Sequence, residues 1–76
     1  MEIQPGTYRH FKGNRYQVIG IARHSETLEE MVVYRALYNG PEFGRNALWV
    51  RPKKMFLEEV EVDGKKVPRF KLVETP

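Results

Sequence analysis

The sequence contains no cysteine, although chains this short often depend on disulfides or metal ions for stability. That absence excludes a disulfide scaffold, a thiolate metal site and a cysteine nucleophile together. The longest uninterrupted apolar run, residues 18–22, is far shorter than the roughly 20 residues of a membrane helix. The first residues also lack the charged and apolar regions of a secretory signal. We therefore expect a cytoplasmic protein with no membrane association.

Net charge is also small, because 13 basic residues against 10 acidic ones leave only +3. This balance is compatible with a polyanionic partner but lacks the dense basic stripe that is typical of one. The hydrophobic content of 41% is that of an ordinary globular chain. A chain of 76 residues has room for one domain. We predict a single domain over residues 1–76 with its core at about residues 5–73, as a monomer or a weak homodimer.

Apolar residues recur mainly at every second position, in short runs that glycine-bearing turns separate, which indicates an all-β fold. Gly20 lies where the long second strand can bend sharply. Ser25 can cap a helical turn over residues 25–30, and Pro52 can begin another over residues 52–55. The predicted strands cover residues 7–11, 15–24, 31–38, 47–51, 56–62 and 65–73. Because closure removes exposed sheet edges, we predict a small SH3-like barrel of five or six antiparallel strands with a short helical turn near Pro52.

The dipeptide Asp63-Gly64 is the strongest turn signal in the chain and predicts a hairpin. In that register both charge and apolarity match across the strands. The predicted pairs are Glu61 with Lys66, Val60 with Val67, Glu58 with Arg69, and Leu57 with Phe70. Pro68 has no amide to donate, so its strand is expected at an edge or with a bulge. The hairpin's acidic residues are expected to match, in part, the last group of basic residues, Lys65, Lys66, Arg69 and Lys71.

Four blocks of sequence, in order, are similar to a known family. They are Gly6-x-Tyr8-x-His10-x-Lys12-Gly13-x-x-Tyr16-x-Val18, Ala22-x-His24-Ser25-Glu26-Thr27, Val32-Val33-Tyr34-Arg35-x-Leu37-Tyr38 and Leu48-Trp49-Val50-Arg51-Pro52-x-x-Met55-Phe56. From about residue 5 to residue 72 the chain resembles the short bacterial family catalogued as domain of unknown function 1653. The resemblance implies an SH3-like fold and no particular activity. The loop over residues 39–46, with one aromatic in its middle, looks longer than in that family, so its contacts are expected to be particular to this protein.

His10 and His24 are the only side chains that normally titrate near neutral pH. The chain has no paired-histidine motif, so we expect no metal and no cofactor. His24 adjoins Ser25, but neighbours on an extended chain point apart and do not form a nucleophile with its base. A structural role for His24, bonding backbone at the end of a strand, is the favoured interpretation. We predict no enzyme unless a carboxylate such as Glu58 or Glu59 approaches a histidine.

Large aromatic residues and basic residues suggest a binding surface. If Leu48 and Val50 face the core, alternation places Trp49 and Arg51 together on the outer face. Bases stack on rings while cations contact phosphates, so this surface predicts recognition of RNA or single-stranded nucleic acid. The alternative is a protein interaction adapter that binds a peptide or subunit through the same surface. The candidate ligand-binding residues are Trp49, Arg51, Tyr34, Tyr38, Arg9, Arg45, Lys53 and His24.

Overall fold

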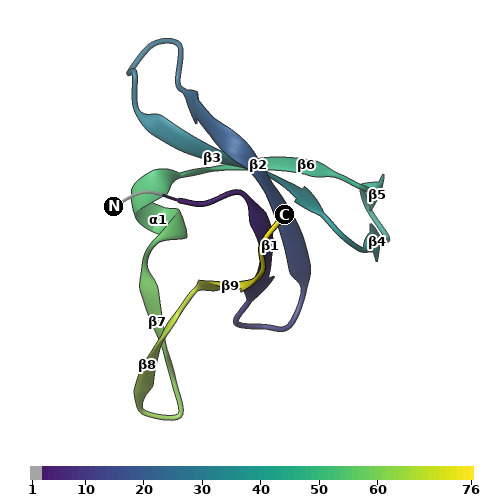
Figure 1. The fold of residues 1–76 in the computed structure, drawn as a ribbon, viewed down its shortest axis with the longest axis vertical. Helices are drawn as coiled ribbons and strands as arrows, with labels where there is room; N and C mark the ends of the chain where they lie inside the picture. The colour runs from purple at the N-terminus through teal and green to yellow at the C-terminus, as the bar shows by residue number, and fades with distance from the viewer. Residues whose placement is uncertain (1–2) are drawn as a thin grey trace.

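A computed structural model of the chain describes residues 3–76 and consists almost entirely of strands (Figure 1). The elements in chain order are β1 (Gly6–His10), β2 (Arg15–Arg23), β3 (Glu30–Ala36), β4 (Asn39–Gly40), β5 (Gly44–Arg45), β6 (Leu48–Pro52), α1 (Lys53–Phe56), β7 (Glu59–Val62), β8 (Lys65–Pro68) and β9 (Phe70–Glu74). The predicted all-β fold is confirmed. So is the helical turn after Pro52, where α1 begins. No helix in the described part of the chain is long and apolar enough to cross a membrane.

Five antiparallel strands form the main sheet in the order β6-β3-β2-β1-β9, and the pairs β4-β5 and β7-β8 form two small sheets. Figure 1 shows three hairpins leaving the main sheet in different directions: the far end of β2–β3, the β4–β5 pair and the β7–β8 pair. Each hairpin joins residues that are close in sequence.

The predicted closed barrel is not found within residues 3–76, because β6 and β9 remain the two edges of the sheet. The sheet nevertheless curls. The guanidinium of Arg51 on β6 lies 5.6 Å from the ring centre of Phe70 on β9, so side chains rather than backbone hydrogen bonds join the edges. The register of β2 against β3 shifts between Val18 and Gly20, which confirms an irregularity where the bend was predicted, although β2 stays in one sheet.

An aromatic core fills the concave side of the curled sheet. The ring of Phe56, from α1, stacks on that of Phe70 with centroids 4.2 Å apart and planes 5° apart. The buried residues of this cluster are Tyr8, Val18, Val32, Tyr34, Phe56 and Phe70. Rings of this size bury roughly 150–250 Å² each, which is how a small domain obtains a core without disulfides. The predicted contact of Leu57 with Phe70 is wrong, because the α1 turn directs Phe56 inward and leaves Leu57 exposed.

The predicted hairpin of β7 and β8 is confirmed in its register. Glu61 lies opposite Lys66, and the turn residues Asp63 and Gly64 have φ of 52° and 78°. A carboxylate oxygen of Glu58 lies 3.8 Å from the guanidinium of Arg69, as predicted. The other predicted pair, Val60 with Val67, is present as well. Local turn chemistry and cross-strand matching were thus sufficient to predict this element.

At the tip of the β2–β3 hairpin a single turn is present, closed by the hydrogen bond from the Leu28 N–H to the His24 carbonyl at 2.8 Å, but the predicted capping role of Ser25 is wrong. Instead, Nδ1 of His24 accepts hydrogen bonds from the backbone N–H groups of Glu26, at 3.1 Å, and Thr27, at 3.3 Å. The imidazole satisfies the amides that a helix cap would otherwise satisfy. This confirms the structural role that was favoured for His24 at the end of a strand.

Candidate functional site

The predicted aromatic and arginine surface does not exist as one exposed face. Tyr34 is only 5% exposed and belongs to the core, so its predicted place on a binding surface is wrong. Trp49 lies directly opposite Tyr34 and therefore shares its inner face. Leu48 and Val50 are 61% and 60% exposed, so the assumption that they face the core is also wrong. Alternation was correct, but the two faces of β6 were interchanged.

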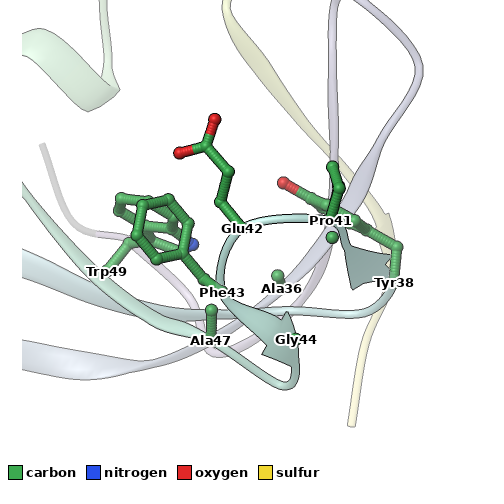
Figure 2. A pocket seen from close by; sticks show the side chains of 9 residues that line it. Ala36, Tyr38, Pro41, Glu42, Phe43, Gly44, Ala47 and Trp49 are labelled. Carbon is green, nitrogen blue, oxygen red and sulfur yellow. The ribbon is translucent and has the colours of Figure 1, made fainter.

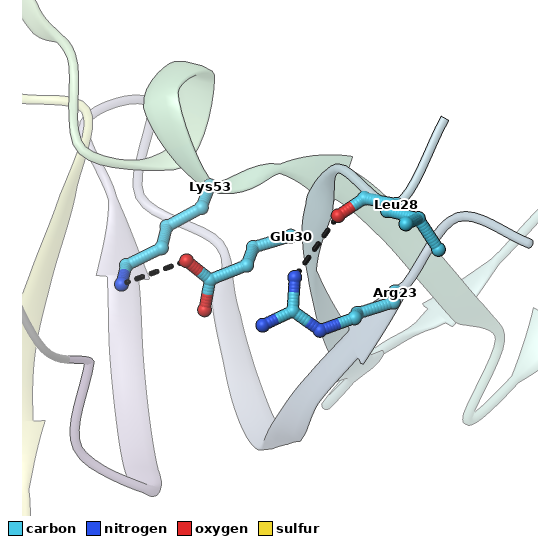
Figure 3. Close-up of polar contacts among 4 residues, drawn as sticks. All are labelled: Arg23, Leu28, Glu30 and Lys53. Carbon is cyan, nitrogen blue, oxygen red and sulfur yellow. Dashed lines mark hydrogen bonds and ion pairs between the residues drawn. The ribbon is translucent and has the colours of Figure 1, made fainter. Parts of the chain in front are cut away.

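Arg51 and Lys53 are engaged within the fold. Nε of Arg51 donates to the Tyr34 hydroxyl at 3.4 Å, on the same side as its contact with the Phe70 ring. Nζ of Lys53 lies 3.7 Å from a carboxylate oxygen of Glu30, next to the tip of the β2–β3 hairpin, as Figure 3 shows. Both cations therefore stabilise contacts between elements.

Beside the Lys53 ion pair, a second contact closes the β2–β3 hairpin. Arg23 donates from its guanidinium to the backbone carbonyl of Leu28 at 3.0 Å (Figure 3). Leu28 has a φ of 62°, a left-handed conformation that is uncommon for a branched residue. The hairpin tip is therefore held by its own polar contacts, with His24 on one side and Arg23 on the other.

Trp49 and Tyr38 instead line a cavity of about 230 Å³, which we call the aromatic pocket (Figure 2). The rings of Phe43 and Trp49 meet edge to face, with centroids 5.2 Å apart and planes at 88°. The pocket is lined by Ala36, Tyr38, Gly40, Pro41, Glu42, Phe43, Gly44, Ala47 and Trp49. Most of these residues come from the long loop, which folds as the unpredicted β4–β5 hairpin. Sequence analysis placed neither Phe43 nor Glu42 in a site.

Tyr16 holds the Tyr38 wall of the pocket in place. The two hydroxyls lie 3.0 Å apart, and the rings pack edge to face at 5.6 Å. Burial, followed by the hydrogen bond to Tyr38, raises the pKa of Tyr16 to about 12. Tyr16 therefore stays a neutral phenol at physiological pH and acts as a structural donor or acceptor rather than as a base. Arg45, predicted to join this surface, lies beside Tyr38 but outside the pocket.

A second cavity, of about 600 Å³, lies between the β1–β2 turn, β9 and the β7–β8 hairpin. We call it the basic groove. It is lined by Arg9, His10, Phe11, Lys12, Gly13, Arg15, Val62, Val67, Pro68 and Lys71, and these include four cations and no acidic residue. The predicted clustering of Arg9, Lys12 and Arg15 is confirmed. The expectation that the hairpin's acids partly match the last basic residues is confirmed for Lys66, opposite Glu61, and for Arg69, beside Glu58, whereas Lys71 lies opposite Arg9.

Three of the groove's cations form a row across adjacent strands. Arg9 on β1 lies directly opposite Arg15 on β2 and directly opposite Lys71 on β9, and all three are exposed. Neighbouring strands are only about 4.8 Å apart, and like charges in facing positions destabilise a sheet. We call this set the cationic row. The fold tolerates repulsion here that an anion in the groove would relieve.

His10 lines the groove and packs against the aromatic core. Its Nδ1 accepts a hydrogen bond from the backbone N–H of Lys12 at 3.2 Å, and its ring packs edge to face on Phe70 at 4.9 Å. Burial, and then the charges of Arg51, Arg69 and Lys12, lower the pKa of His10 from its ordinary value. The imidazole is therefore neutral at pH 7 and suited to accept that hydrogen bond.

Within residues 3–76, no three side chains of histidine, aspartate or glutamate converge closely enough to hold a metal ion. Glu58 forms its ion pair with Arg69 and not with a histidine. The prediction that the protein has no catalytic residues stays a prediction. The two cavities are thus the candidate binding sites.

Comparison with known proteins identifies relatives of the whole fold. The family model described as "Protein of unknown function (DUF1653)" matches residues 6–72. A crystal structure of a DUF1653 protein from Bordetella bronchiseptica is 35% identical, with a TM-score of 0.86, and the match covers 99% of this chain and 92% of that chain. None of the curated proteins matches the sequence. The chain therefore belongs to the DUF1653 family of proteins of unknown function.

Proposed function

We propose that this protein binds RNA or single-stranded DNA in the basic groove. The observation that carries the proposal is the cationic row, in which Arg9 faces both Arg15 and Lys71 at the cost of repulsion within the sheet. Cations concentrated on one surface release counterions when they contact phosphates, and this release favours binding. The row spans three strands, which suits an extended polyanion better than a single small anion.

Phe11 favours a single strand over a duplex. Its ring is partly exposed at the groove, and the ammonium of Lys12 lies 5.8 Å from the ring centre. A stacking surface beside a cation matches the way unpaired bases and their phosphates are bound. Bases in a duplex are already stacked on one another and are not available to such a ring.

The acidic residues of the β7–β8 hairpin do not oppose this proposal. Val62 lines the groove, and successive residues on a strand point to opposite faces. Glu61 does not line the groove and lies opposite Lys66. The hairpin presents an apolar wall of Val62, Val67 and Pro68 to the ligand.

The test is a titration of fluorescently labelled twelve-nucleotide oligouridine and oligothymidine, followed by anisotropy between about 50 and 300 mM salt. Four phosphate contacts to a single strand predict a slope of about −3 for log affinity against log salt concentration. Lys71→Gln should reduce the slope to about −2. Lys54→Gln removes the same charge from α1, outside the groove, and should leave the slope unchanged.

Stacking is tested separately. Phe11→Ala should weaken binding by about five-fold or more without changing the slope, because it removes a ring and no charge. Phe43→Ala, which removes a ring from the aromatic pocket, is the matched control and should bind normally. Absence of binding at low salt, or equal effects of Lys71→Gln and Lys54→Gln, would refute the proposal.

A further inference from the structure

We propose that the aromatic pocket binds a lysine or arginine side chain of an extended peptide segment in a partner protein. The Phe43 and Trp49 rings form a right-angled corner, Tyr38 contributes another wall, and Glu42 contributes a carboxylate (Figure 2). Aromatic faces and a carboxylate together attract cations. The inference does not rest on nucleic-acid binding, because the aromatic pocket and the basic groove share no lining residue.

The exposure of the pocket rings indicates that folding does not require them. Phe43 is 63% exposed and Trp49 is 36% exposed, and neither belongs to the buried core cluster. The hairpin that carries Phe43 has two residues in each strand and pairs only with itself. Large rings clustered on the surface in this way are typical of a binding site.

Charge distinguishes the ligand. Among residues 3–76, Glu42 is the only charged residue that lines the pocket, so a phosphate or carboxylate would be repelled. A purely apolar side chain would cover the Glu42 carboxylate without giving it a partner, which is costly. An ammonium or guanidinium group satisfies the carboxylate and the negative ring faces together. The cavity of about 230 Å³ has the scale of one long side chain.

The position of Trp49 on β6 indicates a peptide rather than a free amine. β6 is an edge of the main sheet whose Arg51 end meets β9 through a side chain, so an added strand would pair with the backbone of residues 48–50. Side chains of such a strand alternate between the two faces. One face of β6 leads to the pocket through Trp49, and the other presents exposed Leu48 and Val50. A cationic residue followed by an apolar one matches both faces.

Trp49 provides a direct assay because it is the only tryptophan in the chain. The probes are nine-residue peptides with threonine and valine flanks that differ only at the central residue: arginine, lysine, trimethyllysine, citrulline or norleucine. We expect the three cationic peptides to change the Trp49 emission saturably. Citrulline and norleucine, which have similar size and no charge, should bind at least about five-fold more weakly.

Two variants with matched controls locate the site. Glu42→Gln should weaken the arginine peptide by about five-fold, and Glu61→Gln, which removes an exposed carboxylate from β7, should not. Phe43→Leu should weaken binding, whereas Phe11→Leu, in the basic groove, should not. Because Phe43 is largely exposed, we expect its variant to keep the wild-type circular dichroism spectrum.

Three outcomes would overturn the inference. One is equal affinity for the arginine and citrulline peptides, which would make the pocket merely apolar. The second is the absence of a saturable Trp49 signal with every cationic peptide. The third is an oligonucleotide that binds more tightly after Glu42→Gln, which would assign the pocket to nucleic acid. If this inference fails, the proposed nucleic-acid binding in the basic groove is unaffected, because the Lys71 and Phe11 variants test that groove separately.

Discussion

Replacing Arg9 with glutamine is expected to stabilise the free protein while weakening its binding to oligonucleotides. Arg9 faces two cations, Arg15 and Lys71, in the paired strands. Two charges about 5 Å apart in water repel by about 0.8 kcal/mol. Salt and the freedom of the long side chains reduce this to about 0.3 kcal/mol for each pair. Removing both repulsions should therefore add about 0.6 kcal/mol, which raises the Tm of a domain this size by about 3 °C.

The assay is thermal unfolding followed by circular dichroism at about 20 and 500 mM salt, because screening should shrink the gain as salt rises. Lys54→Gln changes the net charge equally but removes a cation from the last turn of α1, where it is favourable, so we expect no gain from it. The affinity for oligonucleotides should fall for Arg9→Gln and stay unchanged for Lys54→Gln. A lower Tm for Arg9→Gln, or a gain that salt does not reduce, would show that the cationic row is not repulsive.

Two further predictions concern the core and the response to pH. Phe56→Ala removes a buried ring that stacks on Phe70 and should lower the free energy of unfolding in urea by about 3–5 kcal/mol, whereas Phe43→Ala should lower it by less than about 0.5 kcal/mol. Similar losses for the two variants would contradict the assigned core. The pKa of His10 is lower in the folded protein than in the unfolded chain, so the unfolded chain binds the proton more readily as the pH falls. The stability that neutral His10 contributes above about pH 6.5 should therefore be lost as the pH falls towards the folded pKa. His10→Gln should make the urea midpoint less dependent on pH between about pH 7 and 5.5. If the variant keeps the wild-type pH dependence, His10 is not the group that causes it.

Local features of the fold were predictable because neighbours in sequence determine them. The Asp63-Gly64 turn has the left-handed conformations that its residue types favour, and the facing pair of Glu61 and Lys66 followed from the turn. The α1 turn begins after Pro52, as expected. The role of His24 at a strand end was also predictable, because its ring bonds amides only two and three residues away.

Features that depend on distant residues were predicted less well. Lys71 was grouped with Lys65, Lys66 and Arg69 as partly matched by the hairpin's acids, but strand pairing places it opposite Arg9. Glu42 and Phe43 were not predicted as site residues, because the turn over the loop brings Phe43 against Trp49 on another strand. A loop has no regular sequence pattern that predicts which strand it will pack against. Barrel closure was likewise expected from strand number alone, whereas the edges β6 and β9 meet through side chains.

By itself, the sequence determined an all-β domain without disulfides, its main turns and the clustering of Arg9, Lys12 and Arg15, because spacing and turn chemistry act over a few residues. Only the tertiary structure decided which face of β6 points inward, since an alternating pattern is equally regular in either orientation. Burial of Tyr34 beside Trp49 settled that choice. Stacked rings take the place of the missing cysteines, and four cations gather in one groove because strand pairing brings distant residues together.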